Sequence, residues 1–211
     1  MMKERYDDLD EYIGDLKAEI AANEKCATHH YNLGVALLSK RDFVAAEEAF
    51  LNAVRQSPHL AEAYIQLGGI CMERGDLEGC LRYNQEAANC RPKYAIPQAN
   101  IAFVHLQQGR PDEALKALAK ALQWNPKLVQ ARNGLAIAHY MQGDYKASEG
   151  DCRALLADEP EFGPAWQNLS LALFQQERFP EAAQACDRAI ALGCEVPEQF
   201  LADLEPHREK K

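Results

Sequence analysis

Apolar residues follow a single repeating pattern along most of the chain. Within residues 27–194 they recur at helical spacing over about 14 residues, stop, and resume for about another 14. Pro58, Pro92, Pro126 and Pro160 follow one another every 34 residues, and aligning on them stacks five units without a gap. A period of this length indicates an array of helix pairs, each packed against the next.

Two kinds of column in this alignment have a structural meaning. The seventh position is always Leu or Ile, whereas the eighth is Gly, Ala or Ser and the twentieth is Ala, Cys or Ser. Small residues let two antiparallel helices approach closely, and the larger apolar column fills the space between them. The pattern therefore predicts a tight helix crossing inside every unit.

The break between the two helices of a unit also has a signature. Gly75, Gly109 and Gly143 share one position, which is suited to a left-handed residue after a helix end. Pro111 and Pro180 fall where the second helix begins, and a missing N–H is tolerated in the first turn. These residues predict where each first helix ends and each second helix starts.

The columns resemble the tetratricopeptide repeat, whose signature is W-x-x-L-G-x-x-Y, then A-x-x-x-F, then P. The first unit carries His30, Leu33, Gly34, Leu37, Ala46, Phe50, Ala53 and Pro58, and the fifth carries Trp166, Leu169, Ala182 and Ala189. The aromatic position of the signature is instead Asn84, Leu118, Cys152 and Cys186 in units two to five. The resemblance implies an all-α fold, a right-handed superhelical α-solenoid of antiparallel helix pairs with N- and C-terminal capping helices.

We expect seven segments. The repeats are 27–60, 61–94, 95–128, 129–162 and 163–196, followed by a capping helix and charged tail at 197–211, where Phe200 and Leu204 would cover the last repeat. Residues 1–26 predict an acidic amphipathic helix, with Leu9, Ile13, Leu16 and Ile20 on one face. That helix either caps the array or pairs with another chain.

Composition and charge exclude several classes of function. Apolar residues make up 47% of the chain and charged residues 26%, and the formal net charge is −9. An acidic chain repels phosphate backbones, so nucleic-acid binding is disfavoured. No apolar run is long enough for membrane insertion, and the charged first ten residues do not predict a secretory signal.

Catalytic and metal-site patterns are weak. Seven cysteines form no C-x-x-C pair, which indicates a reducing, cytoplasmic compartment. His105 and His139 share the eleventh position with Cys71, but equivalent positions lie about 10 Å apart, too far for shared coordination. Without a nucleophile elbow, phosphate loop or zinc motif, we expect no enzyme activity, no cofactor and no metal.

The cysteines divide into two groups by their place in the repeat. Cys80, Cys152 and Cys186 lie on packing columns, so we expect them in the core. Cys26, Cys90 and Cys194 lie near helix or array ends, where we expect more exposure.

The family resemblance implies that the first helices of the repeats line a concave groove. None of the thirty groove positions is Lys or Arg, so the family's carboxylate clamp is missing. Asn32, Asn100 and Asn168 match in part the asparagine column with which one branch of the family holds a peptide backbone. The predicted peptide-binding residues are Tyr31, Asn32, Val35, Leu38, Ile65, Gln66, Met72, Asn100, Phe103, Leu106, Asn133, Ile137, Tyr140, Asn168, Leu171 and Phe174.

These observations favour a non-catalytic interaction scaffold or adaptor, such as an assembly factor. Its partner would be a protein segment with spaced large apolar residues, because an uncharged groove gains affinity by burying such side chains. The alternative is a self-associating structural scaffold, a homo-oligomer formed through the N-terminal helix and the groove.

Overall fold

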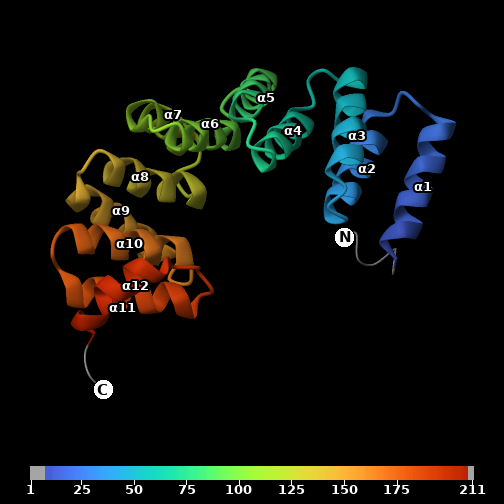
Figure 1. The fold of residues 1–211 in the computed structure, drawn as a ribbon. Coiled ribbons are helices and arrows are strands. Elements are labelled where there is room, and N and C mark those ends of the chain that lie inside the picture. Colours follow the sequence, from blue (N-terminus) through green and yellow to red (C-terminus); the bar gives the residue numbers. More distant parts are fainter. Residues whose placement is uncertain (1–7, 209–211) are drawn as a thin grey trace. The chain divides into compact units, whose positions relative to one another are not determined.

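A computed structural model describes residues 8–208, which form twelve α-helices and no strand (Figure 1). The chain divides into two compact units, each longer than one repeat: Met1–Pro97, called the first unit below, and Gln98–Lys211, called the second unit. The helices are α1 (Leu9–Ala22), α2 (Ala27–Ser39), α3 (Phe43–Gln56), α4 (Ala61–Glu73), α5 (Leu77–Cys90), α6 (Ala95–Gln107), α7 (Pro111–Trp124), α8 (Val129–Met141), α9 (Tyr145–Asp158), α10 (Gly163–Gln175), α11 (Phe179–Ala191) and α12 (Glu198–Leu204), followed by the short 3₁₀ turn η1 (Glu205–His207). The all-α solenoid architecture predicted from the sequence is confirmed.

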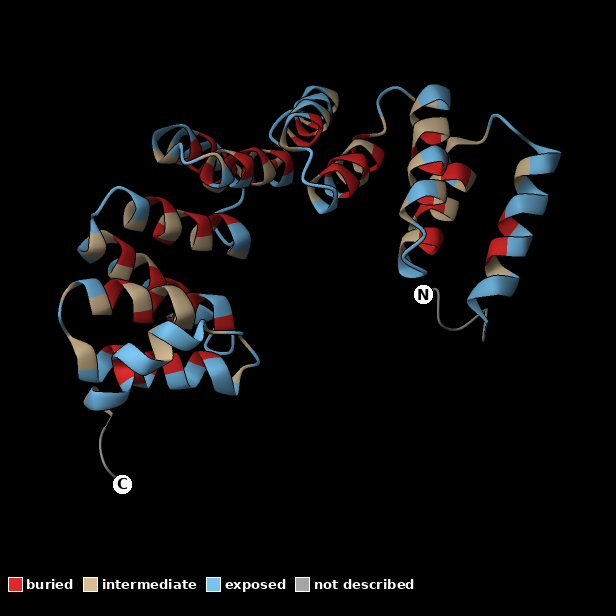
Figure 2. Cartoon of the chain, viewed as in Figure 1, coloured by how far each residue is buried: buried red, intermediate tan, exposed pale blue. Residues whose placement is uncertain are grey.

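Helix pairs are the building blocks of both units. In the first unit α2 packs on α3 and α4 packs on α5; in the second, α8 packs on α9 and α10 packs on α11. Neighbouring pairs also touch, through α3 with α4 and through α9 with α10. Buried positions lie along one face of second helices such as α7, whereas first helices such as α6 are buried over more of their circumference (Figure 2).

The contact between α2 and α3 shows why the eighth and twentieth repeat positions need small residues. Phe50 is fully buried, and its ring occupies the space where Gly34 has no side chain. A Cβ built on Gly34 would lie 2.6 Å from Cε1 of Phe50, closer than atoms normally approach. Ala46 and Ala53 are also fully buried, so both helices present small residues where they meet.

The breaks between paired helices behave as the glycine column predicts. Gly75, Gly109 and Gly143 have φ of 74°, 71° and 79°, in the left-handed region that favours glycine. Arg41 and Glu177 occupy the same repeat position with φ of 60° and 59°. A side chain is strained in this conformation, so these two turns carry a cost that the glycine turns avoid.

Second helices begin in one of two ways. Asp42, Asp76 and Asp144 each accept a hydrogen bond from the backbone N–H three residues later, which satisfies an otherwise unpaired donor. At α7 and α11 the residue before the helix is arginine, and Pro111 or Pro180 takes its place in the first turn. The prolines therefore lie where the sequence predicted them.

The terminal helices cover apolar surface at the two ends of the chain. Ile13 and Leu16 of α1 are buried in the core of the first unit, where α1 packs against α2. Leu204 of α12 is fully buried, and the ring of Phe200 lies 5.2 Å from that of Phe174. Residues 1–7 of the predicted N-terminal segment and 209–211 of the predicted tail lie outside the described residues. Among the described helices, none is both long and apolar enough to cross a membrane.

Replacing Gly34 with alanine should destabilise the protein by about 1–3 kcal/mol, because the new Cβ forces the buried Phe50 ring to move. Gly150 is the matched control: it is exposed within α9, and nothing lies within 4 Å of its Cβ position. Gly150→Ala should stabilise by about 0.5–1 kcal/mol through helix propensity. Urea unfolding would measure both, and equal effects of the two changes would contradict this packing.

Glu177→Gly should raise the free energy of unfolding by about 0.5–1 kcal/mol, because glycine adopts the left-handed conformation without strain. Ala119→Gly, at an exposed position inside α7, should instead lower it by about 1 kcal/mol. Thermal unfolding of both variants checks the pair. Destabilisation by Glu177→Gly would show that this turn is not strained.

Candidate functional site

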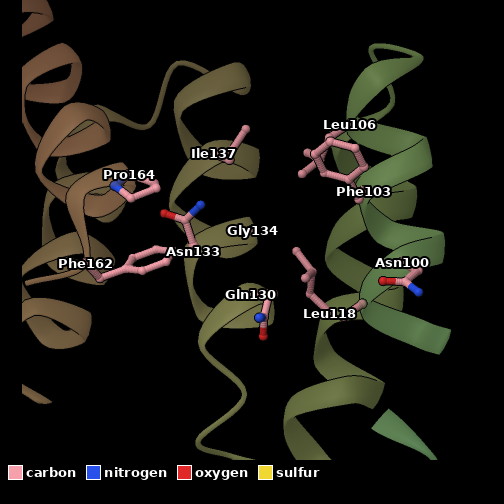
Figure 3. A pocket seen from close by; sticks show the side chains of 11 residues that line it. Asn100, Phe103, Leu106, Leu118, Gln130, Asn133, Gly134, Ile137, Phe162 and Pro164 are labelled. Atoms are coloured by element: carbon pink, nitrogen blue, oxygen red, sulfur yellow. The ribbon is translucent and has the colours of Figure 1, made fainter. Parts of the chain in front are cut away.

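The second unit contains an apolar cavity of about 240 Å³ beside its first helices. Phe103 and Leu106 of α6 and Leu118 of α7 lie on one side, facing Ile137 of α8 (Figure 3). Phe103 is 43% exposed, whereas Leu106 and Leu118 are buried and form the deeper wall. The cavity therefore presents one accessible aromatic ring above a packed apolar floor, the usual build of a small binding pocket.

Side-chain amides surround this apolar pocket. Asn100 of α6 and Gln130 and Asn133 of α8 are among its lining residues. The Nδ2 of Asn168 in α10 donates a hydrogen bond of 2.9 Å to Oδ1 of Asn133. Five predicted residues thus come together at the pocket, namely Asn100, Phe103, Leu106, Asn133 and Ile137.

The remaining lining residues were missing from the predicted site. Phe162 precedes α10, Pro164 lies in the first turn of α10, and Gln130 lies in the first turn of α8. Leu118 comes from a second helix, and Ala99 and Gly134 have little or no side chain. A Cβ on Gly134 would lie 2.8 Å from Cδ2 of Leu118, so the leucine fills the space that glycine leaves. One signal was available: the groove column that reads Asn32, Gln66, Asn100, Gly134 and Asn168 loses its side chain only in the fourth repeat.

The other predicted residues of the second unit have partners of their own. The ring of Phe174 lies 5.2 Å from both Phe179 of α11 and Phe200 of α12, so both helices pack against it. The ring of Tyr140 lies 5.4 Å from that of Tyr145, and its hydroxyl accepts a hydrogen bond from Gln175. Leu171 is half-buried on α10. These three residues stand outside the pocket.

The predicted residues of the first unit are less concentrated. Leu38 and Gln66 line a separate hollow of about 370 Å³ whose walls include Arg41 and Glu73. Tyr31 packs its ring 5.7 Å from that of Phe50. The half-buried residues Asn32, Val35, Ile65 and Met72 line neither this hollow nor the apolar pocket. The charged walls make this hollow a poorer match to an apolar ligand than the pocket of the second unit.

Arg132, the neighbour of Asn133 along α8, has its partners outside the pocket lining. Arg132 of α8 donates to Oδ2 of Asp158 at 2.7 Å and to the carbonyl of Ala154. None of the eleven lining residues is charged. The pocket therefore offers no counter-ion for a charged ligand group.

The two histidines of the eleventh column do not share a site. Nδ1 of His139 lies 2.7 Å from Oδ2 of Asp151, while Nδ1 of His105 is buried without a partner among the described residues. The described part of the chain holds no group of three or more His, Cys, Asp or Glu side chains placed to hold a metal ion.

The cysteines on the packing columns are buried, as predicted. Cys80, Cys152 and Cys186 lie in the core, while Cys26, Cys90 and Cys194 are half-buried free thiols. Burial raises the pKa of the Cys152 thiol to about 12 and that of Cys80 to about 11. A thiol that holds its proton is a poor nucleophile, so these two side chains serve packing.

Iodoacetamide at about pH 8 should modify Cys26 and Cys194 well before Cys80 and Cys152, because the last two are buried and protonated. Mass spectrometry of the alkylated peptides, compared with a denatured control, measures the order. Since the folded pKa of Cys80 and Cys152 lies above the ordinary thiol value, stability should also fall as the pH rises above about 9. Equal labelling of all four thiols in the native protein would contradict this arrangement.

Comparison with known proteins places this arrangement in a family. A tetratricopeptide-repeat model matches residues 105–150, and a second model of the same description matches 13–61 and 153–193. Together the two models match well over half of the chain.

Similarity to individual proteins is more distant. BBSome complex member BBS4 of Bos taurus is 24% identical over 166 residues, which cover 77% of this chain and 31% of that protein. Photosystem I assembly protein Ycf3 of Cyanophora paradoxa is 40% identical over 52 residues, or 25% of this chain and 30% of that protein. The matches thus span about a third of the length of these two relatives.

A solved structure gives the same architecture over nearly the whole chain. The crystal structure of YrrB, described as a TPR protein with an unusual peptide-binding site, superposes with a TM-score of 0.67 at 18% identity. The match covers 90% of this chain and 97% of that one. With the repeat models, the helix pairs and the packing columns in agreement, the chain belongs to the tetratricopeptide-repeat family.

Proposed function

We propose that this protein is a non-catalytic interaction scaffold that binds an apolar segment of a partner protein at the pocket of its second unit. The exposed ring of Phe103 above an uncharged apolar cavity is the observation that carries the proposal. Burying one large aliphatic or aromatic side chain in such a cavity contributes about 1.5–3 kcal/mol. The flanking amides of Asn100, Gln130 and Asn133 would hold the polar backbone on either side of that side chain.

The comparisons support a role in protein assembly. Ycf3 is a photosystem I assembly protein, BBS4 is a member of a complex, and YrrB has a peptide-binding site. For this chain we propose the corresponding general role, an adaptor or assembly factor whose ligand is a protein segment. Its seven unpaired cysteines fit a reducing compartment such as the cytoplasm.

The packing of α1 bears on the self-association alternative. Ile13 and Leu16, the centre of its apolar face, are already buried against α2 of the same chain. A helix that pairs with another chain would have to give up this contact. This favours α1 as a cap over α1 as an oligomerisation element.

Partner capture with matched variants tests the proposal. Wild-type protein, Phe103→Asp and Val44→Asp would each be used as bait in extract from the source organism, with mass spectrometry of the bound proteins. Val44 is the control because it is 80% exposed on α3 and is not among the residues that line the pocket, so both variants place a charge on an exposed apolar residue. We expect the partner to bind wild-type protein and Val44→Asp but not Phe103→Asp, since a carboxylate in an apolar pocket is costly to desolvate.

Binding of the purified partner provides the quantitative check. Phe103→Ala should weaken it by about 1–3 kcal/mol in isothermal titration calorimetry. Raising the salt concentration should change the affinity little, because the pocket lining is uncharged. Affinity that collapses with salt but survives Phe103→Asp would place the interaction elsewhere, and a mass that grows with concentration in light scattering would favour self-association.

A further inference from the structure

Another hollow, of about 260 Å³, lies between α9 and α11 of the second unit. Helix α10 packs against both of these helices and contributes Trp166, Leu169 and Leu173 to the lining. The indole N–H of Trp166 donates to the carbonyl of Pro160 at 2.8 Å, which orients the ring. The lining shares no residue with the apolar pocket, so this hollow is a separate feature of the surface.

Most charges at this hollow neutralise one another. Arg153 of α9 pairs with Glu149 at 2.8 Å and with Glu181 at 3.3 Å. Arg178 pairs with the same two glutamates, each at 2.6 Å, so two guanidinium groups and two carboxylates form a balanced network. Arg188 of α11 also lines the hollow, but it forms no ion pair or hydrogen bond with a described residue. Its positive charge is the one that the surroundings leave uncompensated.

The preceding repeat shows how this chain compensates such a charge. Arg132, which stands 34 residues before Trp166, donates to Oδ2 of Asp158 at 2.7 Å. In the last repeat the cation is Arg188, and the position equivalent to Asp158 is Leu192. The last repeat therefore keeps a guanidinium group but lacks the carboxylate that pairs with it in the repeat before.

We propose that this hollow binds an acidic segment of a partner protein, with a side-chain carboxylate paired to Arg188 and an adjacent apolar side chain against Trp166. Arginine pairs with carboxylates through two parallel hydrogen bonds, and the half-buried indole offers an apolar surface beside that pair. Phosphate polyanions are a poorer match, because the chain carries a net charge of −9 and repels them.

Two further donor groups line the hollow. Nη1 of Arg153 donates to none of the described residues, while Nε and Nη2 are held by Glu149 and Glu181. Gln184 lies one turn before Arg188 on α11, and its amide has no partner in the part of the chain that the structure describes. A segment with two acidic side chains can thus use Arg188 for one carboxylate and Arg153 or Gln184 for the next. Because Arg153 is already held in place, less conformational freedom is lost when the segment binds.

A pentapeptide tests the proposal through the fluorescence of Trp166. Trp124 is the other tryptophan of the chain, so the Trp124→Phe variant reports on Trp166 alone. Acetyl-Glu-Glu-Phe-Glu-Glu-amide should produce a saturable change in emission, whereas acetyl-Gln-Gln-Phe-Gln-Gln-amide, which lacks the charges, should not. Isothermal titration calorimetry of the unmodified protein should give the same affinity. An equal change produced by sodium phosphate at the same ionic strength would indicate a simple anion site and overturn the proposed segment.

Matched charge changes assign the interaction to Arg188. Arg188→Gln should lower the affinity for the acidic peptide about tenfold. Lys120→Gln is the control, because Lys120 is exposed at the same repeat position of α7 and does not line the hollow; it should change the affinity less than about twofold. Equal losses in the two variants would indicate an effect of net charge alone and overturn the proposal, as would an unchanged affinity in Arg188→Gln.

A carboxylate built into the protein provides the converse test. Gln184→Glu places an acid one turn before Arg188, the arrangement that favours an ion pair within a helix. It should compete with the peptide and lower its affinity about fivefold, without lowering the melting temperature. Gln123→Glu adds the same charge at an exposed position of α7 outside the hollow and should change the affinity less than about twofold. Equal effects of these two variants would contradict the pairing of Arg188 with the peptide.

Salt distinguishes this site from the apolar pocket. Binding of the acidic peptide should weaken at least about fivefold between about 0.05 and 0.5 M NaCl, because exposed charges are screened. An affinity that does not change with salt would overturn the proposal. Since the two sites share no lining residue, either proposal can fail while the other holds.

Discussion

Close approach between paired helices is the constraint on which the rest of this structure depends. Two helices can pack this closely only where one of them carries a small side chain or none. Gly34 does so for Phe50, and Ser170 does so in the last pair while donating its hydroxyl to the carbonyl of Ala182. Because the interior of each pair is filled in this way, some side chains of the first helices remain at the surface, as Phe103 does with 43% of its area exposed.

The same rule explains how the pocket of the second unit arises. Gly134 lies one turn from Ile137 on α8, and Leu118 reaches into the space that the glycine leaves. The pocket wall is therefore apolar at the position where four other repeats place an amide side chain. Gly134 thus interrupts a column of polar side chains and lets the buried Leu118 form part of the pocket wall.

The sequence was sufficient to predict features that belong to one helix or one turn. Helix content, the left-handed glycines and the proline starts all follow from local conformational preference, and all agree with the structure. Arg41 and Glu177 escaped notice because residue type alone gives no sign of a strained turn, although their column shared with Gly75 could have revealed it. The turn position of a repeat thus takes the left-handed backbone conformation even where its residue is not glycine.

The lining of the pocket was predicted only in part, because a pocket needs side chains from several helices. Periodicity identified which residues point outward, and five of them meet at the cavity. It could not show that Phe174 is covered by Phe200, since that contact depends on where the C-terminal helix docks. Nor could it bring Phe162 and Leu118 to the pocket, because neither lies on the outward face of a first helix.

The pocket is built by three successive first helices, with α6, α8 and the start of α10 all contributing walls. In a stack of repeats each repeat contacts only its neighbours. Cooperative folding across several repeats therefore depends on the contacts between adjacent repeats. A bound segment would add further contacts among these three helices, of which α8 and α10 already touch directly. Ligand binding would then make this part of the stack more rigid and more stable. Any protein attached at either end would experience a stiffer stack when the pocket is filled.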